Sequence, residues 1–267
     1  MSESSLQAMI EGANAYESLM VPALFEEWAP RVAGAARIRP GERVLDLACG
    51  TGVLGREVAR RVGPDGSVIE LDPSPGMLAV ARRLESGVEW QEGAAERLPF
   101  PDESFDAVVS QFGLMFFEDR PRALREALRV LVPEGRLVVA VWDFLDRIPA
   151  YRRFVALVER MAGTQAADPI RAPFVLGDED ELVSLFAEAG AGSVEILTRA
   201  GTARFPSVRD MVEADLRGWL PLVGVVLSEE RISAILVEAE RELGRYGTLE
   251  GRMVFDMSAH LITAQKT

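Results

Sequence analysis

The sequence predicts an α/β fold in which helices cover both faces of a doubly wound, mostly parallel sheet. Short apolar runs, such as 44–47 and 105–110, alternate with longer stretches whose apolar residues recur at helical spacing. This alternation is typical of parallel strands joined by crossover helices. With 267 residues, of which 48% are hydrophobic, the chain can bury one large core with a subdomain attached.

The charge balance disfavours two classes of partner. The formal net charge is −13, whereas nucleic acids and anionic membranes are bound by basic surfaces. We therefore expect a small-molecule partner and no nucleic acid. The longest uninterrupted apolar run, 219–227, contains Pro221 and is too short to span a bilayer. No signal peptide is visible near the N-terminus, so the cytoplasm is the expected compartment.

Cysteine and histidine usage disfavours disulfide and metal chemistry. The chain has one cysteine, Cys49, and one histidine, His260. An internal disulfide is excluded, and neither a CxxC motif nor a pair of histidines is present to bind a metal. Cys49 follows a strand and begins a glycine turn, so we interpret it as a small buried residue rather than a nucleophile.

The segment 43–55, RVLDLACGTGVLG, predicts a strand, a glycine turn and the start of a helix. The turn contains Gly50, Thr51 and Gly52, and the helix that follows ends at Gly63. Such a turn places backbone N–H groups next to a ligand, because glycine has no Cβ to block close approach.

Two cofactor classes use a turn of this kind. Gly50, Gly52 and Gly55 match the G-x-G-x-x-G pattern of dinucleotide-binding folds, which leaves a nicotinamide-dependent oxidoreductase open. Asp46 argues against it, because a carboxylate at the end of the strand repels a pyrophosphate and attracts a ligand with ammonium and sulfonium groups. We therefore favour S-adenosylmethionine over NAD.

The motifs from 43 to 141 resemble those of a known enzyme family. VLDLACGTG is similar to the glycine-rich first motif of class I methyltransferases. The order LPFPD, SFD, FGL and RVL-x-P-x-G-RL most resembles the ubiquinone and menaquinone biosynthesis C-methyltransferases. The resemblance implies S-adenosylmethionine as cofactor, methyl transfer as the reaction, and a seven-stranded sheet whose last strand is antiparallel. The chain after 141 does not follow the quinone pattern.

The second strand, 67–71, ends at Asp72, which we expect to bind the ribose hydroxyls of the cofactor. A carboxylate at the tip of the neighbouring strand has this role in dinucleotide folds. Glu70 lies two residues further from the tip and is the less favoured alternative. Ser74 and Pro75 predict the start of a helix. Met77 in this helix is either a contact of the adenine or a core residue.

The third strand, 88–91, leads to the segment that the resemblance assigns to the adenine. The family has an acidic or amide side chain followed by alanine, and here the pair is Ala94 and Ala95. The backbone N–H of Ala95 can bond the ring, but the exocyclic amine needs another acceptor, for which Glu92 and Glu96 are candidates. The resemblance also places Gln111, which precedes FGL, beside the cofactor.

Polar residues follow four predicted strands at their carboxyl ends, where ligands bind in sheets of this class. They are Asp46, Asp72, Gln111 and Asp143. Between the last two, Asp119 and Pro121 predict the start of a helix that ends at Pro133-Glu134-Gly135, before a fifth strand at 137–142.

The outer segments predict a cap and a lid. A helical region, 6–36, precedes the first strand, and the resemblance makes Tyr16 a candidate cofactor contact. A helix at 151–161, a loop with Pro169 and Pro173, a helix at 178–189 and a strand at 193–197 follow the core. Ser207 and Ser228 predict helix starts, and 253–264 predicts the closing strand. The domains are expected at 1–40, 41–145, 146–204, 205–250 and 251–267.

We interpret 146–177 and 205–248 as a lid over the substrate, with a dimerisation surface as the alternative. In-line methyl transfer requires alignment in a dry pocket and a base only for a weakly acidic acceptor. The candidate bases are Tyr16, Asp143, Tyr151 and His260, of which His260 is expected to be a packed residue. Five apolar side chains suggest a small aromatic or apolar acceptor: Phe112, Met115, Phe116, Trp142 and Trp219. A binding protein that retains the fold without the chemistry is a further alternative.

Overall fold

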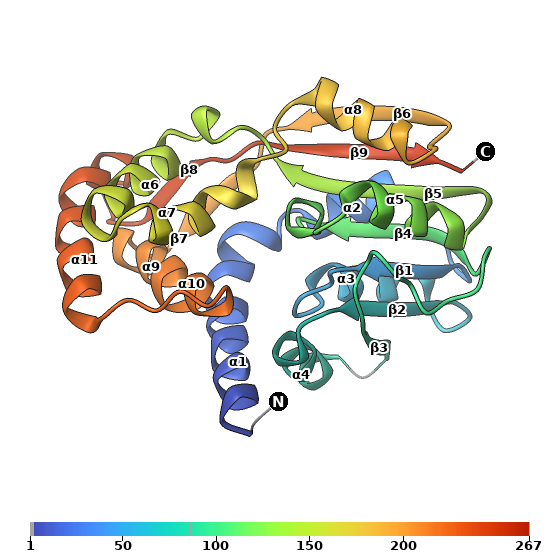
Figure 1. Cartoon of the computed structure of the whole chain (residues 1–267), viewed down its shortest axis with the longest axis horizontal. Helices are drawn as coiled ribbons and strands as arrows, with labels where there is room; N and C mark the ends of the chain where they lie inside the picture. The colour runs from blue at the N-terminus through green and yellow to red at the C-terminus, as the bar shows by residue number, and fades with distance from the viewer. Residues whose placement is uncertain (1–2, 86, 267) are drawn as a thin grey trace.

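The computed structural model describes residues 3–85 and 87–266, arranged in two lobes with the N-terminal helix between them (Figure 1). One lobe is a seven-stranded sheet with helices on both faces. The other lobe consists of helices and a two-stranded sheet. The predicted doubly wound α/β architecture is confirmed.

The order of strands in the large sheet is β3-β2-β1-β4-β5-β9-β6. Strand β9 is antiparallel to its neighbours β5 and β6, and the other pairs are parallel, as expected for this fold. The carboxyl ends of β1 to β5 therefore meet at one edge. The strands are β1 Arg43–Leu47, β2 Ser67–Asp72, β3 Glu89–Glu92, β4 Phe105–Gln111, β5 Leu131–Trp142, β6 Ser193–Arg199 and β9 Ala259–Gln265.

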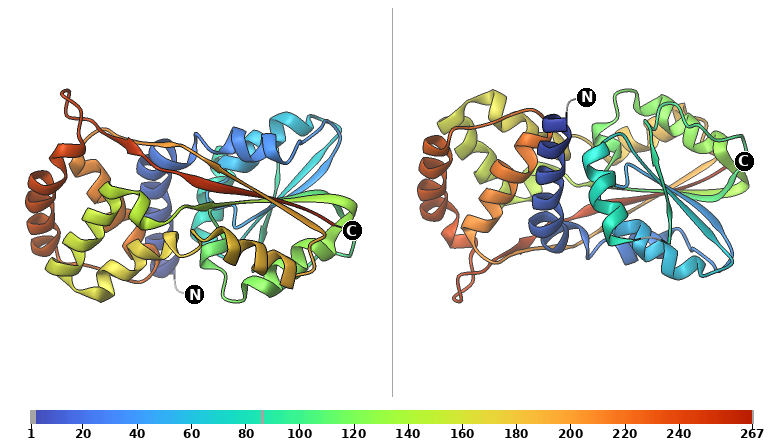
Figure 2. Two further views of the ribbon diagram at one scale, coloured as in Figure 1. Left: turned by 90° about the horizontal axis from the view of Figure 1, so that it is seen from above. Right: turned by 90° about the horizontal axis from the view of Figure 1, so that it is seen from below.

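Helices cover the central strands on both faces, which explains why those strands are almost wholly apolar. Helices α2 and α3 lie on one face, and α5 and α8 lie on the other (Figure 2). Val44, Leu45 and Leu47 of β1 are at most 2% exposed. The bounds are α2 Ala29–Ala35, α3 Val53–Val62, α4 Pro75–Leu84, α5 Arg120–Val130 and α8 Glu179–Glu188.

The predicted helix starts are confirmed by their capping hydrogen bonds. The Ser74 hydroxyl accepts from the backbone N–H of Met77 at 3.3 Å, and the Asp119 carboxylate accepts from that of Arg122 at 3.0 Å. Ser207 and Ser228 cap their helices in the same way. Each cap satisfies a donor that has no partner within its own helix.

The second lobe, called here the helical lobe, is built from two separate parts of the chain. It contains α6 Pro149–Ala162, α7 Thr164–Arg171, α9 Val208–Glu213, η5 Ala214–Trp219, α10 Leu220–Leu222 and α11 Glu229–Leu243. Strands β7 Thr202–Phe205 and β8 Met253–Asp256 form its small antiparallel sheet. Short 3₁₀ turns complete the chain at η2 Leu114–Phe116, η3 Leu145–Arg147, η4 Ala172–Phe174 and η6 Gly244–Tyr246.

The N-terminal segment lies between the lobes. Helix α1 Glu3–Ala15 packs against α4 of the sheet lobe and against η5 and α10 of the helical lobe. It continues into η1 Tyr16–Phe25, a π-helix with Pro22 inside it. Pro22 has no N–H to donate within this helix, and π-helical turns are frequent at functional sites. Tyr16 is thereby placed where the two lobes meet.

Three predicted elements need correction. Pro133-Glu134-Gly135 does not end α5, which stops at Val130; these residues form an irregular part of β5, where the Glu134 N–H donates to the carbonyl of Lys266. The predicted loop with Pro169 and Pro173 is α7 followed by η4. The predicted single closing strand is split into β8 and β9, which belong to different sheets.

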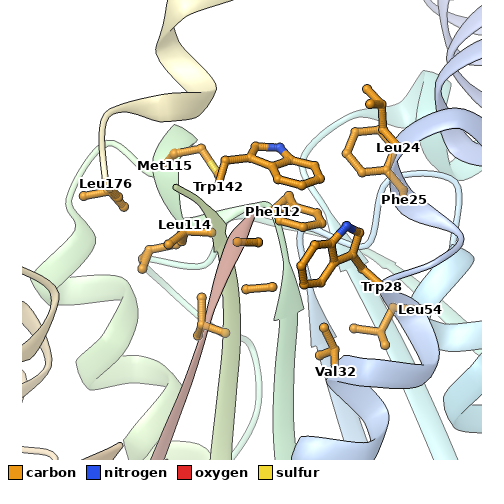
Figure 3. Close-up of a cluster of buried hydrophobic side chains, with 14 of the residues drawn as sticks. Leu24, Phe25, Trp28, Val32, Leu54, Phe112, Leu114, Met115, Trp142 and Leu176 are labelled. Carbon is orange, nitrogen blue, oxygen red and sulfur yellow. The ribbon is translucent and has the colours of Figure 1, made fainter. Parts of the chain in front are cut away.

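An aromatic cluster joins α2 and η1 to the ends of β4 and β5 (Figure 3). The rings of Phe112 and Trp142 stack at 3.7 Å with an interplanar angle of 8°. Trp28 packs edge-on against both rings at 5.8 Å. Phe25 completes the cluster at 5.8 Å from Phe112. The rings of Phe25, Phe112 and Trp142 also line a cavity between the sheet lobe and the helical lobe.

Candidate functional site

A cleft with a volume of about 440 Å³ runs along the carboxyl ends of β1 to β4, and we call it the strand-end cleft. Its sheet side contains Gly50, Asp72, Ala94, Ala95 and Gln111. Its other side comes from α1, the start of η1 and the helical lobe, and includes Met9, Tyr16, Trp219 and Leu222. Most of the predicted cofactor residues are therefore brought to one cavity, as the parallel topology requires.

Asp72 is held in this cleft by two backbone hydrogen bonds. Its two carboxylate oxygens accept hydrogen bonds from the backbone N–H groups of Gly50 and Ser74, each at 2.8 Å. Burial raises the pKa of Asp72 to about 6, and the two backbone donors act in the opposite direction. The remaining lone pairs are available to accept from vicinal hydroxyls, as predicted for the ribose contact.

The backbone around the cleft is held in an uncommon conformation. Ala48 and Phe112 have φ of 56° and 58°, a region that residues with a side chain seldom adopt, and both line the cleft. Strain of this kind persists where the surrounding structure determines it, and it is concentrated at functional sites. The turns after β1 and β4 thus place these uncommon backbone conformations at the edge of the cavity.

Thr51 and Gly52 do not line the strand-end cleft. Thr51 is buried, and its carbonyl accepts from the Arg56 guanidinium at 2.7 Å. Gly52 has φ of 81°, and a Cβ there would lie 2.6 Å from the Trp90 ring. Gly52 is therefore needed for the turn and for packing, and of the three turn residues only Gly50 reaches the cavity.

Asp46 requires a correction. Its side chain is 1% exposed and is not part of the cleft lining. It is paired across the sheet with Glu70, which is also fully buried, and the Glu70 carboxyl fills the space where Gly55 would carry a Cβ. Burial, with the facing Glu70, raises the pKa of Asp46 well above its usual range. A direct contact between Asp46 and the cofactor does not fit this position.

Gln111 offers an acceptor to the cleft. Its side-chain N–H donates to the Phe25 carbonyl at 3.1 Å, whereas its amide oxygen is buried without a partner among the residues that the structure describes. A buried oxygen without a donor is costly. A ligand ammonium group would supply that donor, and this fits the predicted position beside the cofactor.

The far end of the cleft is where the adenine is expected. Met77, Ala94, Ala95 and Glu96 all line it. The Glu96 carboxylate already accepts from the N–H of Glu118 at 3.0 Å, while Glu92 is exposed and is not part of the lining. Of the two predicted replacements for the missing polar residue, Glu96 is thus the one in position.

A second cavity, the aromatic chamber, adjoins the cleft and has a volume of about 70 Å³. Tyr16, Phe112, Phe116 and Trp219 line both cavities and so form their shared wall. The remaining lining is Met20, Leu24, Phe25, Trp142, Tyr151, Ile170, Pro173, Phe174, Asp215 and Met257. Four of the five predicted substrate residues are present; Met115 is buried in the core and is not part of the lining.

The four candidate bases separate into two pairs. Tyr16 and Tyr151 line the chamber. Asp143 and His260 lie outside both cavities: Asp143 accepts from Ser258 at 2.8 Å, and the His260 ring contacts the Thr198 hydroxyl at 2.9 Å and the Gly177 carbonyl at 3.0 Å. These contacts satisfy both side chains, and His260 is fully buried as predicted for a packed residue.

Sequence reasoning missed Asp215. This acid is 3% exposed and lines the chamber, and its carboxylate accepts from the Tyr151 hydroxyl at 3.3 Å. Its position, four residues before the predicted substrate residue Trp219, was a usable signal, because residues four apart share one helix face.

No helix in the described ranges is long and apolar enough to cross a membrane. No cluster of three or more metal-binding side chains is found within 3–85 and 87–266 either.

Sequence comparisons place this chain in a protein family. Residues 45–139 match the model of the methyltransferase domain. The ubiquinone/menaquinone biosynthesis C-methyltransferase of Bordetella parapertussis is 36% identical over 66% of this chain and 74% of its own length. Its counterpart in Bordetella avium is 45% identical over 50% of this chain, and the demethylmenaquinone methyltransferase of Symbiobacterium thermophilum is 38% identical over 54%. The matches span only 54% and 58% of the length of these last two relatives.

Solved structures share the fold across nearly the whole chain. The YcgJ protein of Bacillus subtilis is 23% identical with a TM-score of 0.61, covering 90% of this chain and 98% of its own. A phosphoethanolamine N-methyltransferase of Haemonchus contortus, solved with S-adenosylhomocysteine, is 16% identical with a TM-score of 0.60, covering 96% and 57%. Together with the domain match and the Bordetella relatives, the strand-end cleft identifies this chain as a member of the class I S-adenosylmethionine-dependent methyltransferase family.

Proposed function

We propose that the protein transfers a methyl group from S-adenosylmethionine in the strand-end cleft to a small aromatic acceptor in the aromatic chamber. The observation that carries this proposal is the wall shared by the two cavities. Tyr16, Phe112, Phe116 and Trp219 contact both spaces, so a ligand in each would meet at these residues. Transfer between two bound molecules depends on such contact, because holding the reactants together removes much of the entropic barrier.

The charge of the cleft supports the cofactor. Its lining contains three acids, Asp72, Glu96 and Glu118, and no lysine, arginine or histidine. A dinucleotide pyrophosphate would meet repulsion there, whereas a ligand with ammonium and sulfonium groups would meet attraction. The charge of the cleft, to which Asp46 does not contribute, disfavours the nicotinamide-dependent alternative.

Individual residues of the cleft would have separate roles. Asp72 would accept from the ribose hydroxyls, the Gln111 oxygen from the ammonium group, and Met77 and Ala95 would enclose the adenine. When bound, S-adenosylmethionine supplies a methyl group that is already activated by the positive sulfur. The contribution of the chain is to orient both ligands and to exclude water.

The chamber supports an aromatic acceptor. Eight of its fourteen lining residues are aromatic, and they offer flat apolar surfaces for stacking. The relatives named above act on quinone precursors according to their names, but much of the chamber comes from the helical lobe, outside the matched domain at 45–139. We therefore propose the aromatic class and not the quinone itself, with the helical lobe as the lid.

Calorimetry and turnover test the proposal together. Titration with S-adenosylhomocysteine should show binding, and titration with NADH should show none. Incubation with S-adenosylmethionine and a panel of phenols, quinols and aryl amines should give a methylated product by mass spectrometry. Binding of NADH alone would overturn the cofactor assignment. Cofactor binding without any product across the panel would favour the non-catalytic alternative.

A further inference from the structure

Asp215 and Tyr151 form an isolated polar pair in an otherwise apolar chamber. Asp215 is on η5 and Tyr151 is on α6, two elements from the separate parts of the helical lobe. Each of the two residues is 3% exposed, and the tyrosine hydroxyl donates to the carboxylate at 3.3 Å. Among the residues that the structure describes, no cation forms an ion pair with Asp215.

A buried carboxyl group without a cation is costly to the fold. It contributes nothing to the cleft, which it does not line, and the hydrogen bond from Tyr151 is long. The fold therefore does not explain why an acid is buried in the chamber wall, whereas a role toward a ligand would explain it. A ligand in the chamber would contact it.

We propose that Asp215 is the proton acceptor of the reaction and that its partner is a phenolic hydroxyl on the methyl acceptor. This inference rests on the function proposed above. The hydroxyl proton moves to the Asp215 carboxylate, and a lone pair of the phenolic oxygen forms the new O–CH₃ bond. The CH₃–S bond breaks with its electron pair retained by sulfur, so that the products are a methyl aryl ether, a neutral thioether and a protonated Asp215.

The presence of a base favours a phenol over an amine as the acceptor. A phenolic hydroxyl has one donor, which the Asp215 carboxylate in the chamber lining can accept, and its oxygen becomes strongly nucleophilic as that proton leaves. A neutral amine attacks through its nitrogen lone pair and needs no base before the attack. The aromatic side chains that line the chamber can stack on a phenyl ring, as they stack on one another.

Burial also adjusts Asp215 for this task. The pKa of Asp215 is raised to about 7 by burial, against the opposing effect of the Tyr151 hydrogen bond. A base is most effective when its pKa lies near the working pH. Tyr151 from α6 is the ionisable group in hydrogen-bond contact with Asp215, and Tyr16 from η1 lines the same chamber. The charged residues on η5 and α9 are partly exposed and pair elsewhere: Arg217 with Glu229, and Arg209 with Glu240.

The main variant is Asp215→Asn, which keeps the shape and an oxygen that can accept from Tyr151. With a phenolic acceptor, we expect kcat to fall about 100-fold or more, while the acceptor KM and the S-adenosylhomocysteine affinity change by less than about threefold. In the unmodified protein kcat should rise with pH around 7, and Asp215→Asn should lose this limb. Asp180→Asn, an exposed acid on α8, is the matched control and should change neither value.

Two further measurements separate a chemical role from a structural one. A nitrophenol, whose anion is coloured, should bind with its anion spectrum near pH 7 in the unmodified protein and lose that spectrum in Asp215→Asn. Tyr151→Phe removes the hydroxyl donor, so the pH limb should move upward while activity is retained at high pH.

Several results would overturn the inference. They are an unchanged kcat in a folded Asp215→Asn variant, an unchanged pH limb, or a product methylated on carbon or nitrogen. Failure of the proposed function has a different signature, because no acceptor of any class would then be methylated, while the nitrophenol measurement would still report on Asp215 directly.

Discussion

The strand-end cleft and the aromatic chamber share a wall but come from different parts of the chain. The sheet side of the cleft follows β1, β2, β3 and β4 in order, within the matched domain. The chamber combines η1, the ends of β4 and β5, and elements of the helical lobe from both sides of the β6 strand. The sheet side of the cleft is thus local to a repeated strand-helix pattern, whereas most of the chamber lining depends on contact between the two lobes.

The buried acid in each cavity shows the physical difference. Asp72 accepts from two backbone N–H groups at 2.8 Å, and its pKa is raised to about 6. Asp215 accepts from one side-chain hydroxyl at 3.3 Å, and its pKa is raised to about 7. Backbone donors hold the first acid ready to bind, while the weaker support of the second leaves it suited to take up a proton.

The largest expected effect is on the shared wall. Phe112→Ala should lower the free energy of unfolding by about 3–5 kcal/mol, because it removes a buried ring stacked on Trp142. The folded variant should also lose affinity for S-adenosylhomocysteine and for the acceptor. Phe105→Ala, at the other end of β4 and 3% exposed, is the control. Denaturant unfolding should show a similar loss of stability for Phe105→Ala, and calorimetry should show that this control keeps its affinity for both ligands. Equal binding by the two variants would contradict the assignment of Phe112 to the wall that both cavities share.

Next in size is the effect of Asp72→Asn, which should weaken S-adenosylhomocysteine binding by about 1–3 kcal/mol, the scale of a lost charge-assisted hydrogen bond. Asp106→Asn serves as a control because Asp106, at the start of β4, pairs with Arg43 at 3.0 Å, away from the cleft. Calorimetry should find its affinity unchanged. If the two variants bind equally well, the ribose assignment is incorrect.

Cofactor affinity should also depend on pH. Because the pKa of Asp72 is raised to about 6, its carboxylate gains a proton as the pH falls through 6. We expect S-adenosylhomocysteine to bind about tenfold more weakly at pH 5 than at pH 7. The stability of the ligand-free protein changes in the opposite sense: a raised folded pKa favours folding at low pH, and Asp72's share is lost as the pH rises from about 4 to 6. A pH-independent affinity would contradict this assignment.

The smallest effect concerns the adenine end. Ala94→Asn supplies the polar side chain that the family has at this position, and it should tighten S-adenosylhomocysteine binding by about 0.5–1.5 kcal/mol, the net contribution of one hydrogen bond. Ala94→Leu is the matched control, because it adds similar volume without a polar atom. A gain with leucine and none with asparagine would show that the contact is apolar.

The strands and most helix starts were predictable because their causes are local. The buried runs of β1 and β4, and the caps at Ser74 and Asp119, depend on residues within a few positions of each other. The convergence of Asp72 and Gln111 followed from parallel topology. The predictions were wrong where contacts between distant segments set the bounds of an element. Strand β5 begins earlier than predicted because the Glu134 N–H bonds to the Lys266 carbonyl. The closing segment is split because β8 pairs with β7.

The sequence by itself determined the family and the strand ends that form the cleft, since a strand, a glycine turn and a following helix are specified by neighbouring residues. Only the tertiary structure decided that Asp46 is buried against Glu70 and that Asp215 meets Tyr151 in the chamber. The first contact joins residues 24 positions apart in the chain, and the second joins residues 64 positions apart. Packing between elements, rather than local preference, sets such contacts and the solvation of the groups that make them.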